Sequence, residues 1–144
     1  MDIVLKLYLK EYLEAVCDGS KFANEDEFRD NLMNYLFQKK YPSEKKEIKV
    51  SSKPGCGKEY WLIDIFVSTL GNKFIPIEVK FKEEDADEIL EDIEKIDYRI
   101  EHTVSINEGY VILLTDVINS NFEDELEDTA VHPFRYAIWH REAQ

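Results

Sequence analysis

Two strand-like segments separated by a helical one limit the folds that this chain of 144 residues can adopt. In residues 74–82 apolar and charged side chains alternate, as they do in a strand with one buried face. Residues 110–115 (YVILLT) are apolar throughout, which is typical of a strand covered on both faces. Between them, residues 85–101 repeat isoleucine at helical spacing. The order strand, helix, strand predicts two parallel strands joined by a right-handed crossover.

Two helices are expected in the N-terminal part of the chain. Residues 3–17 and 25–40 carry apolar residues at helical spacing, and Asn24 with Glu27 fits a capping box at the start of the second helix. The apolar face of residues 3–17 is wide for a surface helix, which indicates contact with two neighbours. A homodimer formed through residues 3–17 is one arrangement that would cover it.

Three strands are expected between these helices and the third one. Residues 47–52, 60–68 and 74–82 have the composition of strands, and Leu70-Gly71-Asn72 marks the turn between the last two. The whole pattern indicates an α/β fold of the α+β mixed-sheet kind: three antiparallel strands plus one parallel strand, flanked by helices, with an extra N-terminal helix. No repeat or linker divides the sequence, so residues 1–144 are expected to form a single domain.

The C-terminal tail is less regular. Phe122 and Leu126 suggest a short acidic helix, and residues 134–140 fit either a strand or a last helix. We interpret the acidic runs at 83–94 and 123–128 as solvated faces.

Composition narrows the classes of function. With only Cys17 and Cys56, the chain is expected to carry free thiols in a reducing, cytoplasmic environment. Lys6, Lys10 and Glu11 interrupt the N-terminal apolar run, so no membrane partner is expected. The net charge of −13 disfavours non-specific attraction to nucleic acid or anionic lipid.

Basic side chains nevertheless gather in one stretch, which holds seven lysines between Lys39 and Lys58. Within it, Lys53-Pro-Gly-Cys-Gly-Lys58 looks like part of a nucleotide-binding P-loop, but Ser52 and Glu59 stand where that motif needs Gly and Ser or Thr. It also precedes a strand rather than a helix. We interpret the segment as a turn, from which Lys53 or Lys58 could touch a phosphate.

Asp64 interrupts the most apolar strand of the N-terminal half. Burying a carboxylate there without a partner would cost several kcal/mol, so Asp64 needs a counter-charge or a metal ion. A hairpin centred on Gly71 would pair Ile65 with Ile77 and bring Asp64 opposite Glu78. Two facing carboxylates repel each other unless a cation lies between them.

Glu25 and Lys80 could complete such a site. Glu25 starts the inward face of the second helix, and Lys80 shares a strand face with Glu78. Three carboxylates and a lysine at a sheet edge suit Mg²⁺ or Mn²⁺, with positions left for water and substrate oxygens. Two alternatives remain: Glu78 and Lys80 could form a solvated face with an ion pair worth under about 1 kcal/mol, and Glu27 could replace Glu25.

The pattern Asp64-x13-Glu78-x-Lys80, spread over consecutive apolar strands, resembles the PD-(D/E)XK nuclease superfamily, the fold of many restriction endonucleases and archaeal Holliday-junction resolvases. The order helix, three antiparallel strands, helix, parallel strand also resembles that restriction-endonuclease-like core, over roughly residues 22–116. The chain departs from the family at Ile63, where the name-giving proline often sits. Pro76 removes one ladder donor and could mark a bulge.

The resemblance implies a Mg²⁺- or Mn²⁺-dependent endonuclease that acts on nucleic acid, with DNA a more typical substrate than RNA. Asp64 and Glu78 would ligate the metal together with the backbone carbonyl of Val79. Lys80 would orient the attacking water or stabilise charge on the phosphate, and Glu25 resembles the acidic residue on the family's first core helix. The metal would lower the pKa of its bound water and so supply hydroxide. The lysines expected to contact substrate are Lys53, Lys58 and Lys82.

A second function belongs to another class. The chain could be a catalytically silent protein of the same fold that acts as an acidic binding or inhibitor module. The net charge of −13 supports this alternative, because an acidic surface resembles that of a nucleic-acid mimic.

Overall fold

The computed structural model describes residues 3–17, 22–43, 48–69, 73–81, 86–115, 126–127 and 135–143. Three helices and two β-sheets, one of them mixed, make this part of the chain an α+β fold. The elements are α1 (Ile3–Cys17), α2 (Glu25–Gln38), β1 (Ile48–Ser51), β2 (Tyr60–Ile63), β3 (Ile65–Thr69), β4 (Lys73–Phe81), α3 (Ala86–His102), β5 (Glu108–Thr115), β6 (Leu126–Glu127) and β7 (Arg135–Glu142).

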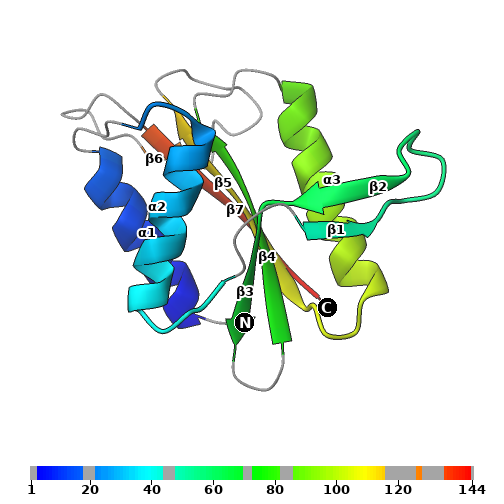
Figure 1. The fold of residues 1–144 in the computed structure, drawn as a ribbon, viewed down its shortest axis with the longest axis horizontal. Helices are drawn as coiled ribbons and strands as arrows, with labels where there is room; N and C mark the ends of the chain where they lie inside the picture. Colours follow the sequence, from blue (N-terminus) through cyan, green and yellow to red (C-terminus); the bar gives the residue numbers. More distant parts are fainter. Residues whose placement is uncertain are drawn as a thin grey trace.

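A five-stranded sheet forms the middle layer, with the strand order β3-β4-β5-β7-β6 (Figure 1). β4 and β5 are parallel and are joined by α3, as the strand, helix, strand pattern predicted, while the other pairs of this sheet are antiparallel. α1 and α2 cover one face of the sheet, and α3 with the short hairpin β1–β2 covers the other (Figure 1). The sheet therefore lies between two different layers.

Each face of the sheet has its own apolar core. The core under α1 and α2 includes Ile65, Ile77 and Val79, and the core under α3 includes Ile63 and Ile96. All eight residues of β5 are buried, which confirms that its continuous apolar run marks a strand covered on both sides. None of the described helices is long and apolar enough to cross a bilayer.

The expected strand 60–68 is wrong in one respect, because it is broken at Asp64. β2 pairs only with β1 in a separate two-stranded sheet, whereas β3 joins the main sheet. The three antiparallel strands therefore do not share one sheet. Ile63 consequently packs in the core under α3, whereas Ile65 packs in the core under α1 and α2.

Of the strand and the last helix expected for residues 134–140, the strand is confirmed, because these residues fall largely within β7. The short helix expected around Phe122 and Leu126 is wrong at Leu126, which belongs to β6, and Phe122 lies outside the described residues. β7 pairs with β5 along its whole length and supplies the neighbour that buries β5.

The start of α2 is fixed by a cap. The Asn24 side chain accepts a hydrogen bond from the backbone N–H of Glu27 at 2.9 Å, and the Glu27 carboxylate accepts one from the N–H of Ala23. The expected capping box thus forms with Ala23 as the second donor. Because Glu27 is used in the cap, it does not replace Glu25 as the α2 carboxylate of the site.

Candidate functional site

The break between β2 and β3 brings Asp64 against β4. Ile65 pairs with Ile77, which confirms the register of a hairpin centred on Gly71. At Asp64, which precedes Ile65, hydrogen bonds between backbone and side chains replace the backbone hydrogen bonds of the strand pair. The N–H of Asp64 donates to Glu78 Oε1 at 3.2 Å, and the N–H of Val79 donates to Asp64 Oδ2 at 3.0 Å. The two carboxylates expected to face each other therefore lie together.

Glu78 is a buried carboxylate, with only 2 % of the residue exposed. Desolvation raises the pKa of Glu78 well above its ordinary value, and the neighbouring charges of Asp64 and Asp92 raise it further. Lys95 acts in the opposite direction, with its Nζ 3.8 Å from Glu78 Oε2. The site thus concentrates more negative charge than this one lysine offsets.

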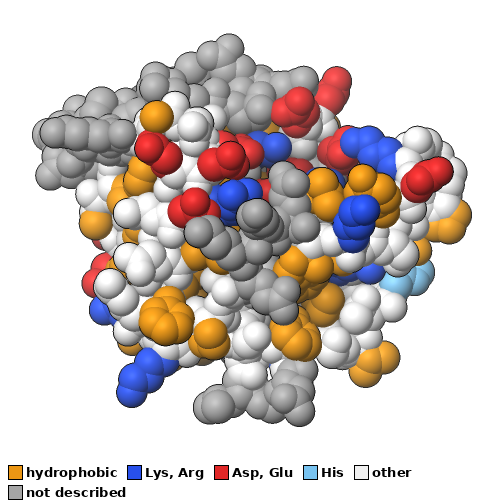
Figure 2. All heavy atoms as spheres, viewed as in Figure 1, with side chains coloured by type: hydrophobic (Ala, Val, Ile, Leu, Met, Phe, Trp, Pro, Cys, Tyr) orange, Lys and Arg blue, Asp and Glu red, His pale blue; other side chains and the backbone are white. Residues whose placement is uncertain are grey.

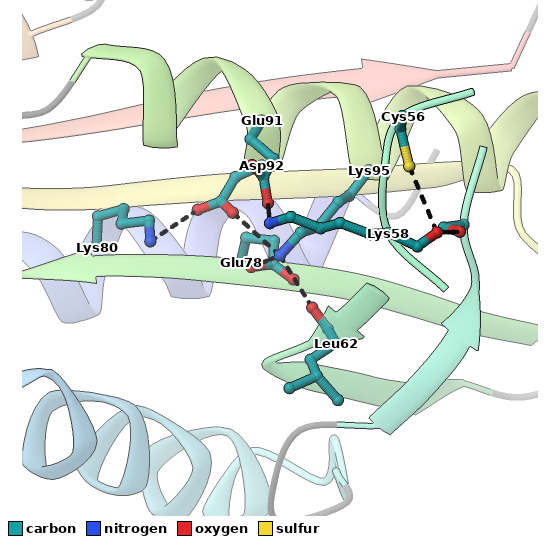
Figure 3. Close-up of polar contacts among 9 residues, drawn as sticks. Cys56, Lys58, Leu62, Glu78, Lys80, Glu91, Asp92 and Lys95 are labelled. Atoms are coloured by element: carbon teal, nitrogen blue, oxygen red, sulfur yellow. Dashed lines mark hydrogen bonds and ion pairs between the residues drawn. The ribbon is translucent and has the colours of Figure 1, made fainter. Parts of the chain in front are cut away.

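Asp92 on α3 holds two lysines at once (Figure 3). Its Oδ2 lies 3.3 Å from Nζ of Lys80, and its Oδ1 lies 3.4 Å from Nζ of Lys95. Asp92 is as buried as Glu78; desolvation raises its pKa, and the two lysines oppose that rise. Each oxygen of this buried carboxylate thus lies within ion-pair distance of one ammonium group, which holds both lysines beside β4.

Both lysines stay protonated at neutral pH. Desolvation lowers the pKa of Lys80, but Asp92 and Glu25 outweigh it, so this pKa lies above its ordinary value. The pKa of Lys95 is raised in the same way, since Glu78 and Asp92 outweigh its desolvation. Lys95 also donates a hydrogen bond to the backbone carbonyl of Leu62 at 3.1 Å (Figure 3).

Glu25 approaches the same group from α2. Desolvation raises its pKa to about 7, opposed mainly by the charge of Lys80 and reinforced by that of Asp64. A hydrogen bond with the backbone of Phe81 also lowers this pKa. Glu25 therefore lies within electrostatic reach of Lys80 and Asp64, as the sequence suggested.

Two of the three lysines expected to contact substrate, Lys53 and Lys58, lie on the β1–β2 hairpin, and each has a partner on α3. Nζ of Lys58 lies 2.7 Å from Glu91 Oε1, and Nζ of Lys53 lies 3.5 Å from Glu94 Oε1. These pairs tie the hairpin to the helix. Lys82 lies outside the described residues.

Asp92 and Lys95 are members of the site that the sequence analysis missed. The acidic run 83–94 was interpreted as a solvated face, and this is wrong at Asp92. The signal was present: Asp92 lies three residues after Ile89 and four before Ile96, so it shares the inward stripe of α3. A carboxylate on an apolar stripe has to be paired, and Lys95, one turn further, is its nearest partner in the chain.

A metal would have to be held by a small set of oxygen donors. Within the described ranges, no group of three or more His, Cys, Asp or Glu residues is arranged to hold a metal ion. The structure brings Asp64 and Glu78 together as a pair and does not add Glu25 to them as a third ligand. Two carboxylates, with water and phosphate oxygens, fit the way in which Mg²⁺ is commonly bound.

The surroundings are acidic. Figure 2 shows Asp and Glu side chains gathered over the starts of α2 and α3, with Lys and Arg side chains among them. Such a surface favours a cation over a second anion. Comparison with family models, with curated proteins and with solved structures finds no match for this chain, so geometry alone bears on what the site does.

Proposed function

We propose that the chain is a Mg²⁺- or Mn²⁺-dependent nuclease that hydrolyses phosphodiester bonds, with DNA as its substrate. The observation that carries the proposal is the pair Asp64 and Glu78, interlocked across β3 and β4 with Lys80 two residues further along β4. The order α2, β1 to β4, α3, β5 supports a restriction-endonuclease-like core over roughly residues 22–116. The separate β1–β2 sheet is a departure from that core.

Asp64 and Glu78 are the proposed metal ligands, with the backbone carbonyl of Val79 as a third donor. When bound, the metal would lower the pKa of a water molecule and so supply hydroxide at neutral pH. Burial and the charge of Asp64 disfavour ionisation of Glu78, and a divalent cation would offset both effects. A role as a metal ligand would explain why a carboxylate occupies this position despite the free-energy cost of burying it.

Lys80 is proposed to stabilise charge on the phosphate. The raised pKa of Lys80 makes it a poor base, which argues against a role in which it takes a proton from water. Its ammonium group is held by Asp92, so it can act as a pre-positioned cation where negative charge develops. Asp92 is then a positioning residue that acts through Lys80.

The test is cleavage of double-stranded and branched DNA by the full chain with Mg²⁺, with Mn²⁺ and with EDTA. We expect metal-dependent cleavage that falls by about 100-fold or more in Asp64→Asn and in Lys80→Gln. Asp26→Asn, on an exposed part of α2, makes the same charge change as Asp64→Asn and should cleave like the original chain. Cleavage that persists in Asp64→Asn would overturn the proposal.

The acidic binding module remains a second candidate because of one observation. Lys53 and Lys58, the hairpin lysines expected to contact substrate in the first proposal, already form ion pairs with Glu94 and Glu91. This candidate predicts binding to a basic protein that weakens steeply with salt, and no metal-dependent cleavage.

A further inference from the structure

A concave region lies apart from the cluster of Glu78 and Asp92. It is a cavity of about 900 Å³ between the start of α1, the loop that follows α2 and the ends of β3 and β4 nearest their turn. In Figure 1 this is the lower end of the molecule, where α1 begins and α2 ends. Its volume falls in the range of pockets that hold small organic ligands and far exceeds the size of one inorganic ion.

Three lysines line this cavity: Lys39, Lys40 and Lys73. None of them forms an ion pair with a carboxylate in the part of the chain that the structure describes. This is unusual in a chain with a net charge of −13, in which acidic partners are plentiful. Unneutralised cations around a concave surface focus positive potential, and an anionic group would complement them.

A structural role explains only part of this arrangement. Lys39 and Lys40 follow the C-terminal end of α2, where positive charge complements the helix dipole. Lys73, however, lies on β4. Lys40 also adopts a left-handed backbone with φ 67°, a conformation that favours glycine or asparagine after a helix. A lysine kept at a strained position beside a cavity points to a use for its side chain.

The rest of the cavity offers aromatic and apolar surface. Tyr8 and Tyr41 line it with their rings edge to face, 6.1 Å between centroids. Nζ of Lys39 lies 5.2 Å from the centre of the Tyr8 ring, so charge and aromatic surface adjoin. Ile75 adds apolar contact on the side of the sheet. A planar apolar group could pack against these rings while an attached anion met the lysines.

One acidic residue, Glu108, also lines the cavity, but its carboxylate is buried and already engaged. It accepts a hydrogen bond from the hydroxyl of Tyr110 at 3.0 Å and lies 3.4 Å from Nε2 of His140. This carboxylate is therefore engaged within the protein, and three lysines line the cavity beside this one acidic residue.

From this juxtaposition we propose that the cavity binds a phosphorylated nucleoside, with its phosphate between Lys40 and Lys73 and its base against Tyr8 and Tyr41. The site shares no lining residue with the Asp64 and Glu78 pair, and the proposal stands or falls independently of nuclease activity. It assigns a role to Lys39, Lys40 and Lys73, which line this cavity and form no ion pair with a carboxylate in the described part of the chain.

The test is calorimetric titration of the full chain with adenosine 5′-monophosphate at low salt in EDTA, so that no metal site contributes. We expect one saturable site, with adenosine and inorganic phosphate each binding at least about tenfold more weakly, since each supplies only half of the contacts. Lys40→Gly and Lys73→Gln should each weaken binding of the monophosphate by about fivefold or more. Lys6→Gln, a lysine on α1 outside the cavity, should leave it unchanged.

Lys40→Gly keeps the test independent of folding, because glycine suits the left-handed backbone and the melting temperature should not fall. The proposal is overturned if the monophosphate does not saturate at millimolar concentration or if inorganic phosphate alone binds equally well. It is equally overturned if binding survives both Lys40→Gly and Lys73→Gln. A melting temperature that is maintained while affinity is lost would support it.

Discussion

The lysines that contact carboxylates near α3 and the lysines around the cavity differ in whether they form ion pairs, although both groups lie in the same acidic chain. Along α3 every lysine that the structure places has a carboxylate partner, and the members of this group are Lys53, Lys58, Lys80 and Lys95. Around the cavity, Lys39, Lys40 and Lys73 have no such partner among the described residues. The first group is committed to internal pairs, and the second is available to a ligand.

Burial explains why two members of the first group, Lys80 and Lys95, must be paired. Asp92 and Glu78 are almost fully inaccessible, so each charge near them needs an opposite charge within a few ångströms. Such a network is a weak source of net stability, since apolar residues of similar size would often serve as well. The network lies on the α3 face of β4, opposite the apolar face that packs under α1 and α2.

The largest expected effect comes from removing the acid between two lysines. Asp92→Ala would leave Lys80 and Lys95 without their shared partner and should lower the free energy of unfolding by about 3–5 kcal/mol. Urea unfolding followed by circular dichroism measures this.

The matched control lies on the same helix. Asp97 pairs with Arg141 at 2.7 Å in a more exposed position, so Asp97→Ala should cost no more than about 1 kcal/mol. Equal losses for Asp92→Ala and Asp97→Ala would show that burial does not separate the two kinds of pair.

Glu25 gives an effect of intermediate size that depends on pH. Burial raises its folded-state pKa to about 7, above the ordinary 4.5 of the unfolded chain. Between these values the unfolded chain releases a proton that the folded chain keeps, so stability falls as pH rises from about 4.5 to 7. Because Glu25 is only partly buried, solvent screening reduces this loss to about 1–2 kcal/mol.

Glu25→Gln removes this titration. In metal-free buffer the variant should gain stability over the original chain at pH 7.5 and show little difference at pH 4.5, as measured by unfolding at the two pH values. A gain of the same size at both pH values would contradict the assignment of the raised pKa to Glu25.

The smallest expected effect belongs to the exposed pairs between the hairpin and α3. Lys58 and Glu91 are each more than a third exposed, so Lys58→Gln should change the free energy of unfolding by less than about 1 kcal/mol. A loss comparable to that of Asp92→Ala would erase the distinction between buried and exposed pairs on this helix.

Patterns that depend on near neighbours predicted most of the fold. The isoleucine spacing of α3 and the apolar run of β5 predicted a parallel pair, and a hairpin centred on Gly71 predicted the register of Ile65 with Ile77. The break at Asp64 could not be predicted in this way, because every neighbour of Asp64 favours a strand. At the break, the Asp64 carboxylate accepts a tertiary hydrogen bond from the N–H of Val79.

The candidate site was likewise predictable only in part. The motif located Asp64, Glu78 and Lys80, since alternation along a strand determines which side chains share a face. Asp92 and Lys95 lie on α3, and in the acidic run of this helix one inward-facing carboxylate is not distinguished by residue type from the exposed ones. The pairing of Lys53 and Lys58 with α3 depends on how the hairpin folds back, which no local pattern encodes.

The central claim is that Asp64 and Glu78 together hold one divalent cation. Calorimetric titration of the full chain with Mn²⁺ at neutral pH tests it most directly, with Asp64→Asn, Glu78→Gln and the exposed-site control Asp26→Asn measured beside it. We predict one saturable site in the original chain and in Asp26→Asn, and none in either of the other two variants. The claim is contradicted if the original chain takes up no Mn²⁺, or if Asp64→Asn and Glu78→Gln take it up as well as the original chain does.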